Sequence, residues 1–415
     1  MLRPADNELL TRVEGDAPMG QMMRAHCWFP ALRSAQLVAD GDPVRVKLLG
    51  SRYVAFRGTD GVIGFMGEAC PHRGVSLALA RNEGCALRCI FHGWKIHASG
   101  QVLETPAEPR NPEAFAAAQK VRTYPTREAG SVVWVFLGDG EPPKFPDFEF
   151  GELPAENMLV LKSPMPFNWL QGVEGTLDSS HVGILHADFL QYFGGHAVMA
   201  AQNLAPRYEV DPRDYGFRAA AVRPLADGSE YVRTTEFVMP FYTSPVASVS
   251  EERAFQVSVP VDDHNSTSWL IRYNLHGPYA RTNPGSPEPT FDPDDYCSPR
   301  GGPDELWGQD REAMRRGVST TGILGGALLE DAVVQASMGS LVDRSQEHLS
   351  SADLAIVKAR RLLLQAVRDF AAGKRPAFAD PNIRFDLIRA EGGVAAPGTN
   401  WREQLPERRQ TMVPA

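Results

Sequence analysis

Four side chains in the N-terminal part of the chain are of types that bind iron or zinc, and they occur as two short mixed pairs. Cys70 and His72 lie in the run CPHRG, Cys89 and His92 lie in the run CIFHGW, and sixteen residues separate His72 from Cys89. A zinc site also takes two cysteines and two histidines, but zinc fingers usually pair Cys with Cys and His with His. Two loops that each offer one thiolate and one imidazole suit a [2Fe–2S] cluster, in which one iron takes both thiolates and the other both imidazoles.

The residues around these pairs favour the cluster. Pro71 stiffens the first loop, and Gly74 and Gly93 let backbone N–H groups approach the bridging sulfides. The paired pattern resembles the Rieske family, and CPHRG with FHGW resembles its oxygenase branch. Position 75 is Val, so the extra loop cysteine of the respiratory-chain type is absent. Cys85, four residues before Cys89, is interpreted as a small semi-buried residue.

A second constellation follows, in which Asp178, His181 and His186 are spaced as D-x-x-H-x4-H. Two histidines and one carboxylate on one face of an iron form the facial triad of non-haem Fe(II) oxygenases. A spacing of five places the histidines about 140° apart on a regular helix, so we expect the helix to end or distort between them, with Gly183 as a plausible place. Asp178 shares a helix face with His181 and can hydrogen-bond its second ring nitrogen.

Downstream of the Cys–His pairs, this spacing resembles the ring-hydroxylating oxygenase alpha subunits, and residues 168–186 are similar to the phthalate dioxygenase branch. The resemblance implies that the third iron ligand is a carboxylate just before a V-Q-x-S-M-G run, and in this chain that residue is Asp331. The neighbouring position, where the branch usually has Gln, is Glu330, which is therefore the rival ligand. Asp178 matches the residue that bridges the cluster of one subunit to the iron of the next. Other branches place an Asn three residues before it, where this chain has Gly175.

The resemblance implies a terminal oxygenase with a Rieske [2Fe–2S] cluster and a mononuclear Fe(II), which activates O2 to hydroxylate an aromatic substrate, an aromatic carboxylate above all. The alternatives are an O- or N-demethylase or a diaryl-ether-cleaving oxygenase on the same site, a Rieske electron carrier, and a START-like binding protein. No G-x-G-x-x-G run follows a strand, so the electrons are expected to come from a partner protein. The resemblance implies that this partner is an NADH-dependent flavin/iron–sulfur reductase. A homotrimer or stacked hexamer is expected, and Arg207 is a candidate for binding the substrate's anionic group.

The elements that must position these residues fall into two predicted domains. Residues 1–145 are expected to form an N-terminal arm and an all-β Rieske domain, with short strands at 44–49, 52–57, 62–66 and 131–138. Residues 146–415 are expected to form an α+β helix-grip (START-like) catalytic domain with an antiparallel sheet, including strands at 216–223, 230–239, 255–260 and 267–274. A late helix at 353–372 carries an apolar stripe and is preceded by Ser350-x-x-Asp353, a possible capping box.

The composition of the chain argues against some classes of binding partner and some cellular locations. The 415 residues carry a net charge of −9, which disfavours nucleic-acid and anionic-membrane partners. No run of apolar residues approaches membrane-spanning length, and the first residues lack the apolar core of a secretion signal. Five cysteines, an odd number, suit a reducing compartment better than a disulfide framework. We therefore expect a cytoplasmic enzyme.

Overall fold

A computed structural model of the chain describes residues 2–190, 197–246, 252–279 and 292–404. The chain forms two compact units: unit 1 comprises Met1–Arg12, Ala17–Met19 and Pro146–Ala415, and unit 2 comprises Val13–Asp16 and Gly20–Phe145. The assignment of residues 1–145 and 146–415 to two functional domains remains a prediction. Within the described ranges, no helix combines the length and the apolar character that crossing a membrane requires.

Unit 2 is built mainly from short antiparallel strands in three small sheets. Its interior is assembled from strands such as β10, Val132–Phe136, whose five residues VVWVF are all buried. The sheets are β1 (Trp28–Arg33), β10 and β9 (Thr126–Ala129); β2 (Val44–Leu48), β3 (Ser51–Arg57) and β4 (Ile63–Gly67); and β5 (Arg81–Asn82), β6 (Ala86–Arg88), β7 (Lys95–His97) and β8 (Val102–Glu104). The first Cys–His run lies between β4 and β5, and the second connects two neighbouring strands of the four-stranded sheet. The helices α2 (Pro18–His26) and α3 (Pro112–Ala117) complete this part of the chain.

Unit 1 is organised around an antiparallel sheet of eight strands within the described residues. The expected α+β class, with a strand-rich N-terminal part followed by helices on an antiparallel sheet, is confirmed. Its strands, in spatial order, are β11 (Met158–Met165), β17 (Ser266–Asn274), β16 (Glu252–Pro260), β15 (Tyr242–Pro245), β14 (Glu230–Val238), β13 (Gly216–Pro224) and β12 (Arg207–Arg213), with β18 (Gly392–Ala395) paired to β14.

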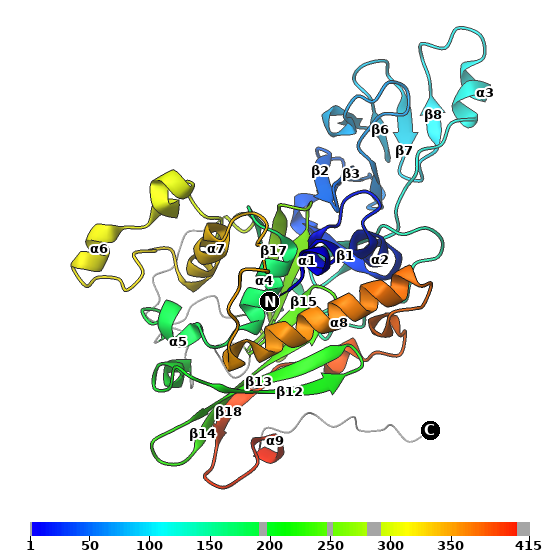
Figure 1. Ribbon diagram of the computed structural model, residues 1–415. Helices are drawn as coiled ribbons and strands as arrows, with labels where there is room; N and C mark the ends of the chain where they lie inside the picture. Colours follow the sequence, from blue (N-terminus) through cyan, green and yellow to red (C-terminus); the bar gives the residue numbers. More distant parts are fainter. Residues whose placement is uncertain (1, 191–196, 247–251, 280–291, 405–415) are drawn as a thin grey trace. The chain divides into compact units, whose positions relative to one another are not determined.

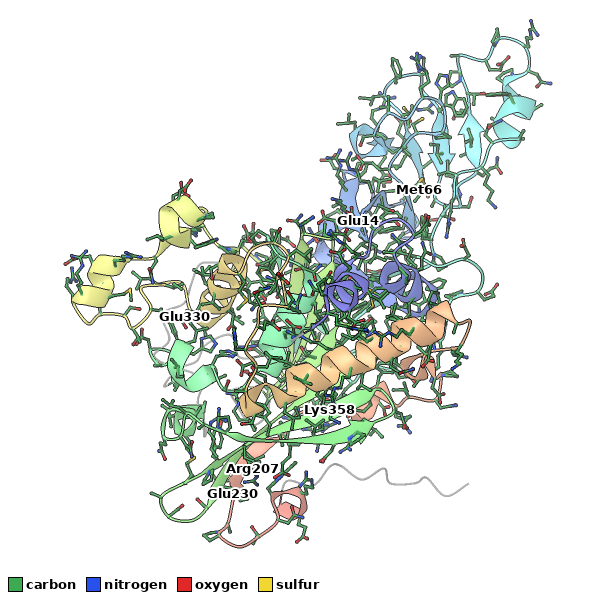
Figure 2. All side chains as sticks on the ribbon, viewed as in Figure 1. Glu14, Met66, Arg207, Glu230, Glu330 and Lys358 are labelled. Atoms are coloured by element: carbon green, nitrogen blue, oxygen red, sulfur yellow. The ribbon has the colours of Figure 1, made fainter. Side chains whose placement is uncertain are left out.

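Two helices pack on this sheet (Figure 1). The first, α4 (Trp169–Leu177), contacts β14 to β17, and the second, α8 (Leu354–Ala371), contacts β12 and β13. The α8 helix buries a stripe that includes Ala359 and Leu363 and leaves Lys358 exposed to solvent (Figure 2). The remaining helices of unit 1 are α1 (Pro4–Thr11), α5 (Val182–Leu185), α6 (Arg311–Arg315), α7 (Ala327–Ser337) and α9 (Trp401–Gln404).

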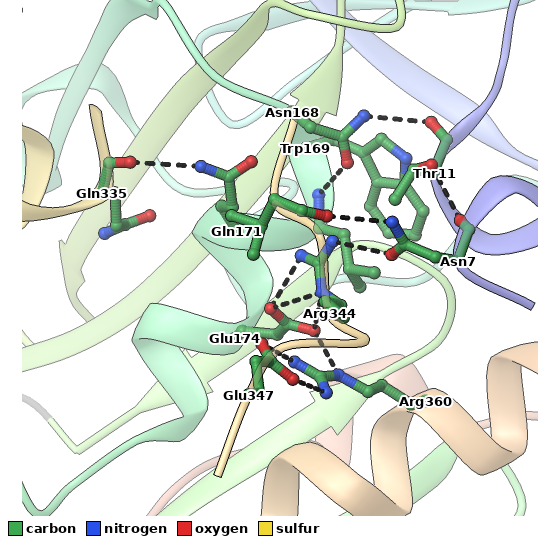
Figure 3. Close-up of polar contacts among 12 residues, drawn as sticks. Asn7, Thr11, Asn168, Trp169, Gln171, Glu174, Gln335, Arg344, Glu347 and Arg360 are labelled. Carbon is green, nitrogen blue, oxygen red and sulfur yellow. Dashed lines mark hydrogen bonds and ion pairs between the residues drawn. The ribbon is translucent and has the colours of Figure 1, made fainter. Parts of the chain in front are cut away.

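A buried ion-pair network joins α4, α8 and the segment that follows α7 (Figure 3). Glu174 on α4 accepts hydrogen bonds from Arg344 at 2.8 Å and from Arg360 at 2.7 Å. Arg360 also pairs with Glu347, and Arg344 donates to the Asn7 side chain on α1. Burial acts to raise the pKa of Glu174, but the two guanidinium groups outweigh it and lower the pKa. The network therefore fixes α4, the helix that leads into the candidate site.

The first prediction concerns this network. Glu174→Gln keeps the shape of the side chain but leaves two buried guanidinium groups without their charge partner. Because removing one member of a buried ion pair is strongly destabilising, we expect the free energy of unfolding to fall by about 3–5 kcal/mol, measured by urea denaturation. Glu312→Gln, which breaks an exposed pair with Arg315, should cost about 0–1 kcal/mol.

The same network predicts a pH dependence. A carboxylate whose folded pKa is lowered contributes stability above its unfolded pKa, about 4.3 for Glu, and loses it as the pH falls through the folded value. The stability difference between wild type and Glu174→Gln should thus shrink in acid. Equal urea midpoints for the two proteins at neutral pH would contradict this account.

Candidate functional site: two Cys–His loops and a converging His–His–Asp cluster

The two Cys–His runs form loops with the same backbone conformation, the first after β4 and the second between β6 and β7. In each loop the cysteine N–H donates to the carbonyl five residues later, from Cys70 to Val75 at 2.8 Å and from Cys89 to Trp94 at 2.9 Å. The glycine four residues after each cysteine donates back to the cysteine carbonyl and has a positive φ, 75° in the first loop and 71° in the second. Only glycine adopts this conformation without strain.

The four predicted cluster ligands lie at the tips of these loops. Cys70 and Cys89 are buried, and the His72 and His92 ring centroids are 4.5 Å apart. Burial raises the pKa of Cys70 to about 11, the His72 backbone N–H opposing this shift and the neighbouring Cys89 thiol adding to it. Nδ1 of His92 is buried and has no hydrogen-bond partner among the described residues. A metal that takes thiolates and an imidazole lone pair would satisfy both groups.

The spacing of these four side chains disfavours a single zinc ion. Four tetrahedral ligands at about 2.0–2.3 Å from one ion lie less than about 4 Å from each other. Among the described residues, only one group of three or more His, Cys, Asp or Glu side chains has its ligand atoms within 4.8 Å of one another, and it does not include Cys70, His72, Cys89 or His92. A cluster with two irons distributes these ligands over a wider space.

The group that does converge is His181, His186 and Asp331 in unit 1. The helix α4 ends before Asp178, and a new helix, α5, begins after His181 and ends before His186. The two histidines therefore lie at opposite ends of one helical turn, with ring centroids 5.1 Å apart. This break, rather than one continuous helix, brings side chains five positions apart to the same place.

The break does not occur at Gly183, which lies inside α5. A Cβ atom at Gly183 would lie 2.4 Å from the carbonyl oxygen of Ala200. The glycine therefore permits close packing of α5 against the 3-10 helix η5 (Ala197–Ala201), and the break itself is made at Asp178, the C-cap of α4. The expectation of an interrupted helix holds, and its suggested position is corrected.

Asp331 on α7 supplies the carboxylate of this group. Its Oδ1 lies 3.3 Å from Nε2 of His181 and 3.2 Å from Nε2 of His186. Burial acts to raise the pKa of Asp331, but the two histidines outweigh it and hold the pKa well below its usual range. Burial acts to lower the pKa of His181, but Asp178 and Asp331 raise it to about 10. Two imidazoles and one carboxylate that converge in this way match a facial triad for iron.

Glu330, the neighbour of Asp331, meets the opposite side of the same cluster. It is fully buried, its Oε2 lies 2.8 Å from Nδ1 of His186, and its Oε1 accepts a hydrogen bond of 2.6 Å from Thr321. Glu330 therefore contacts the ring nitrogen that points away from Asp331. A carboxylate on the far nitrogen of a metal-binding histidine fixes the ring's orientation and tautomer.

Asp178 has the equivalent position at the other histidine. Its Oδ2 lies 3.4 Å from Nδ1 of His181, while its Oδ1 accepts hydrogen bonds from the Ser180 backbone at 2.7 Å and from the Tyr208 hydroxyl at 3.4 Å. Each histidine thus has one carboxylate at Nδ1 and shares Asp331 at Nε2. The Asp178 side chain is 25% exposed, whereas that of Glu330 is 0% exposed, so of these two carboxylates only Asp178 is open to a group outside this cluster.

Residues 319–321 connect the two halves of this site, a role that no sequence motif indicated. The hydroxyl groups of Ser319 and Thr320 donate to Asp188, which follows His186, at 3.0 and 2.6 Å. Thr321 donates to Glu330 on α7, as described above. A Ser-Thr-Thr run before a glycine is a turn signal, but only the fold reveals which carboxylates it reaches.

A cavity of about 30 Å³ lies against Asp331. Its wall combines apolar side chains such as Met165, Phe167 and Leu328 with neutral polar ones such as Gln335, and none of its described lining residues is a cation. A larger concavity of about 450 Å³ lies in unit 2 near Tyr124, but it is lined by none of the candidate metal ligands. The small cavity is therefore the candidate substrate site.

The structure does not bring Arg207 to this cavity. Arg207 lies on β12 with 53% of its side chain exposed, and it forms ion pairs with Glu209 and Glu230. Figure 2 shows Arg207 beside Glu230 and well separated from Glu330. Its guanidinium group is paired with two carboxylates at the surface of the sheet, so the structure gives Arg207 no contact with the cavity.

Comparison with known proteins adds an independent finding. Residues 27–125 match the Rieske [2Fe-2S] domain, and residues 135–412 match the family described as LigXa C-terminal domain like. The chain is 38% identical to the phthalate 4,5-dioxygenase oxygenase subunit of Pseudomonas putida, with 97% of this chain and 94% of that protein covered. It is 34% identical to the 3-chlorobenzoate-3,4-dioxygenase oxygenase subunit of Comamonas testosteroni, with 98% and 99% covered.

A solved structure agrees on the fold. The NdmA QL mutant of Pseudomonas putida CBB5 with theobromine superimposes with a TM-score of 0.60 at 19% identity, and the match covers 92% of this chain and 100% of that one. At this identity the likeness concerns the arrangement of the elements alone.

The second prediction separates Asp331 from Glu330. Asp331→Ala removes a converging ligand atom and should abolish binding of Co(II), used as a probe of the site in protein stripped of metal. Glu330→Gln keeps an acceptor for the N–H of His186, so Co(II) should still bind, with affinity reduced about 10-fold. Isothermal titration calorimetry measures both effects, with thermal unfolding as a check on folding. If Asp331→Ala retains Co(II) and Glu330→Ala loses it, the two roles are reversed.

Proposed function

The chain belongs to the family of Rieske non-haem iron ring-hydroxylating oxygenase alpha subunits, and from this premise we propose that it is the terminal oxygenase of a multicomponent system that hydroxylates an aromatic carboxylate. The observation that carries the proposal is the convergence of His181, His186 and Asp331 in a chain that also carries the two Cys–His loops. When bound, the [2Fe–2S] cluster supplies electrons and the Fe(II) activates O2 beside the substrate.

The chain's own residues have separate tasks in this proposal. Cys70, His72, Cys89 and His92 would hold the cluster. His181, His186 and Asp331 would hold the iron on one side only, which leaves the other side for oxygen and substrate. Glu330 and Asp178 keep each Nδ1 protonated and each Nε2 directed at the metal. Met165, Phe167 and Leu328 line the adjoining cavity with apolar surface and limit access of water.

The substrate class is supported by the relatives. The names of two of them specify phthalate and 3-chlorobenzoate, both benzene rings that carry carboxylate. Dihydroxylation, monohydroxylation, O- or N-demethylation and diaryl-ether cleavage all use this kind of site, and the pose of the substrate decides among them. Phthalate and 3-chlorobenzoate are therefore the first compounds to test.

The proposal extends to partners and location. The electrons would come from an NADH-dependent flavin/iron–sulfur reductase, because the oxygenase subunits in this family work in multicomponent systems. We propose a homotrimer or stacked hexamer with head-to-tail contacts, since a heterologous interface closes into a ring at the right rotation. None of the five cysteines forms a disulfide, which suits the cytoplasm, where NADH is also available.

The third prediction tests the proposed activity. Purified protein should contain about three irons per chain, two in the cluster and one at the triad, and should show a Rieske EPR signal after reduction. With a surrogate reductase and NADH, phthalate or 3-chlorobenzoate should stimulate O2 uptake and yield hydroxylated product. His181→Ala should lose one iron and turnover while the cluster spectrum is retained, and the exposed His276→Ala should match wild type. Zinc without a cluster signal would refute the proposal.

The fourth prediction concerns Asp178 and assembly. In the proposed ring, Asp178 accepts hydrogen bonds from His181 and from His92 of a neighbouring subunit, so it lies on the electron route. Asp178→Asn should leave both metal sites assembled but slow oxidation of the reduced cluster in stopped-flow measurements with substrate and O2. The exposed Asp343→Asn is the control. A protein that sediments as a monomer, or an unchanged rate in Asp178→Asn, would rule out the inter-subunit route and leave Asp178 with an orienting role alone.

A further inference from the structure

The carboxamide of Gln335 is a buried polar group in the cavity beside Asp331 that lacks a full set of partners. Gln335 lies on α7, four residues after Asp331, and is 9% exposed. Its Oε1 is buried and has no hydrogen-bond partner within the described chain. Figure 3 shows one dashed line at this residue, from the Gln171 amide to the Gln335 backbone oxygen. Because an unpartnered buried amide oxygen is costly and rare, such a group is expected to meet a ligand or an ordered water.

Two glycines of α4 provide the space that this carboxamide occupies. Gly172 and Gly175 lie three residues apart and so share one face of the helix. A Cβ at Gly175 would lie 2.8 Å from Nε2 of Gln335, and a Cβ at Gly172 would lie 2.4 Å from Oγ of Ser258. This helix face has no side chains at the two glycines, so it leaves room for the Gln335 amide. A larger residue in place of Gly175 would displace the amide.

Among the described polar side chains that line the cavity, Gln335 is distinguished by a buried acceptor atom without a hydrogen-bond partner. Ser258 already donates to the backbone oxygen of Trp169 at 2.7 Å, and the hydroxyl groups of Ser268 and Tyr296 lie 3.3 Å from each other. No described lining residue is a cation, and the one charged group is the candidate iron ligand. Gln256 lines the cavity too, but it is on the sheet, whereas Gln335 shares a helix with that ligand.

We propose that Gln335 is a substrate-positioning residue, whose carboxamide hydrogen-bonds the polar substituent of the aromatic ring in place of an arginine. This inference rests on the oxygenase function proposed above. The amide N–H groups donate to a substrate carboxylate, and the amide oxygen accepts from a hydroxyl group. Four residues of helix rise about 6 Å, a separation that a substituted benzene ring can span between Gln335 and the metal.

The cavity must widen before it accepts such a ring. Its volume is about 30 Å³, whereas an apolar cavity of about 150 Å³ is known to admit benzene. Gln335 has a flexible side chain, so rotation of its carboxamide onto the substrate both opens the cavity and forms the hydrogen bond. One rotation of the Gln335 side chain would then both make room for the ring and hydrogen-bond its polar substituent.

Steady-state kinetics of the holoenzyme with 3-chlorobenzoate and its methyl ester test the proposal. Gln335→Met preserves length and apolar volume but removes the hydrogen bonds, so the KM for the acid should rise about 10-fold or more with little change in kcat. The methyl ester lacks the anionic acceptor, so its KM should change much less. Gly175→Ala, which pushes the amide aside, should shift the KM for the acid in the same direction by a smaller factor.

Gln171→Met is the structural control. Gln171 holds α7 through hydrogen bonds to the backbone oxygens of Gln335 and Gly339 at 3.1 and 3.0 Å. Its loss should lower the thermal unfolding temperature without changing the ratio of KM values for acid and ester. If Gln335→Met leaves that ratio unchanged in an enzyme whose wild type is active, the inference is wrong. If wild type turns over neither compound nor phthalate, the proposed function is wrong, and the inference that rests on it is wrong as well.

Discussion

The candidate iron site of unit 1 depends on one interaction, the contact of the Asp331 carboxylate with the imidazoles of His181 and His186. A carboxylate that is largely withdrawn from water must be matched by donors or by a metal, or it is protonated or expelled. Here its compensation comes from residues far earlier in the chain, so α4, α5 and α7 must meet within hydrogen-bond distance. The break after α4 and the Glu174 network that holds α4 in place both serve that meeting.

The two histidines are supported by similar chemistry in different surroundings. Each has a carboxylate at Nδ1, but Glu330 is sealed in the interior by Thr321 while Asp178 keeps a quarter of its side chain in contact with solvent. A sealed carboxylate can only orient its histidine. An accessible one can orient its histidine and also receive a donor from outside the chain, which is what an electron route between subunits requires. Burial, more than residue type, therefore distinguishes the two carboxylates.

Much of this arrangement could be predicted from local sequence. The strands came close to their observed bounds, for example 216–223 against Gly216–Pro224, because alternation and turn residues are local signals. The capping of the late helix by Ser350 and Asp353 was also visible, although these residues cap the 3-10 turn that leads into α8. The two Cys–His loops needed only their spacing and glycines to be recognised as a site.

Other features could not be predicted, because they depend on contacts between distant residues. Adjacent acidic residues such as Glu330 and Asp331 look alike in sequence, and only the position of α7 directs one to Nε2 and the other to Nδ1. Asn7 donates to the backbone of Val342, which joins the first residues to unit 1 without any local motif. Gln335 belongs to the V-Q-x-S-M-G run that pointed to Asp331, but the run did not indicate a role for Gln335 itself. That role depends on two glycines of another helix and on a cavity that neither helix forms alone.

Iron-edge anomalous diffraction from crystals of the protein purified with its native metals is the most direct test of the central claim, that one iron lies among His181, His186 and Asp331 and a two-iron cluster lies between the Cys–His loops. The account predicts one isolated peak within bonding distance of both Nε2 atoms and the Asp331 carboxylate, with Glu330 outside bonding distance. It also predicts a close pair of iron peaks between Cys70, His72, Cys89 and His92. A single zinc peak at the loops, or an iron bound by Glu330 rather than Asp331, would contradict it.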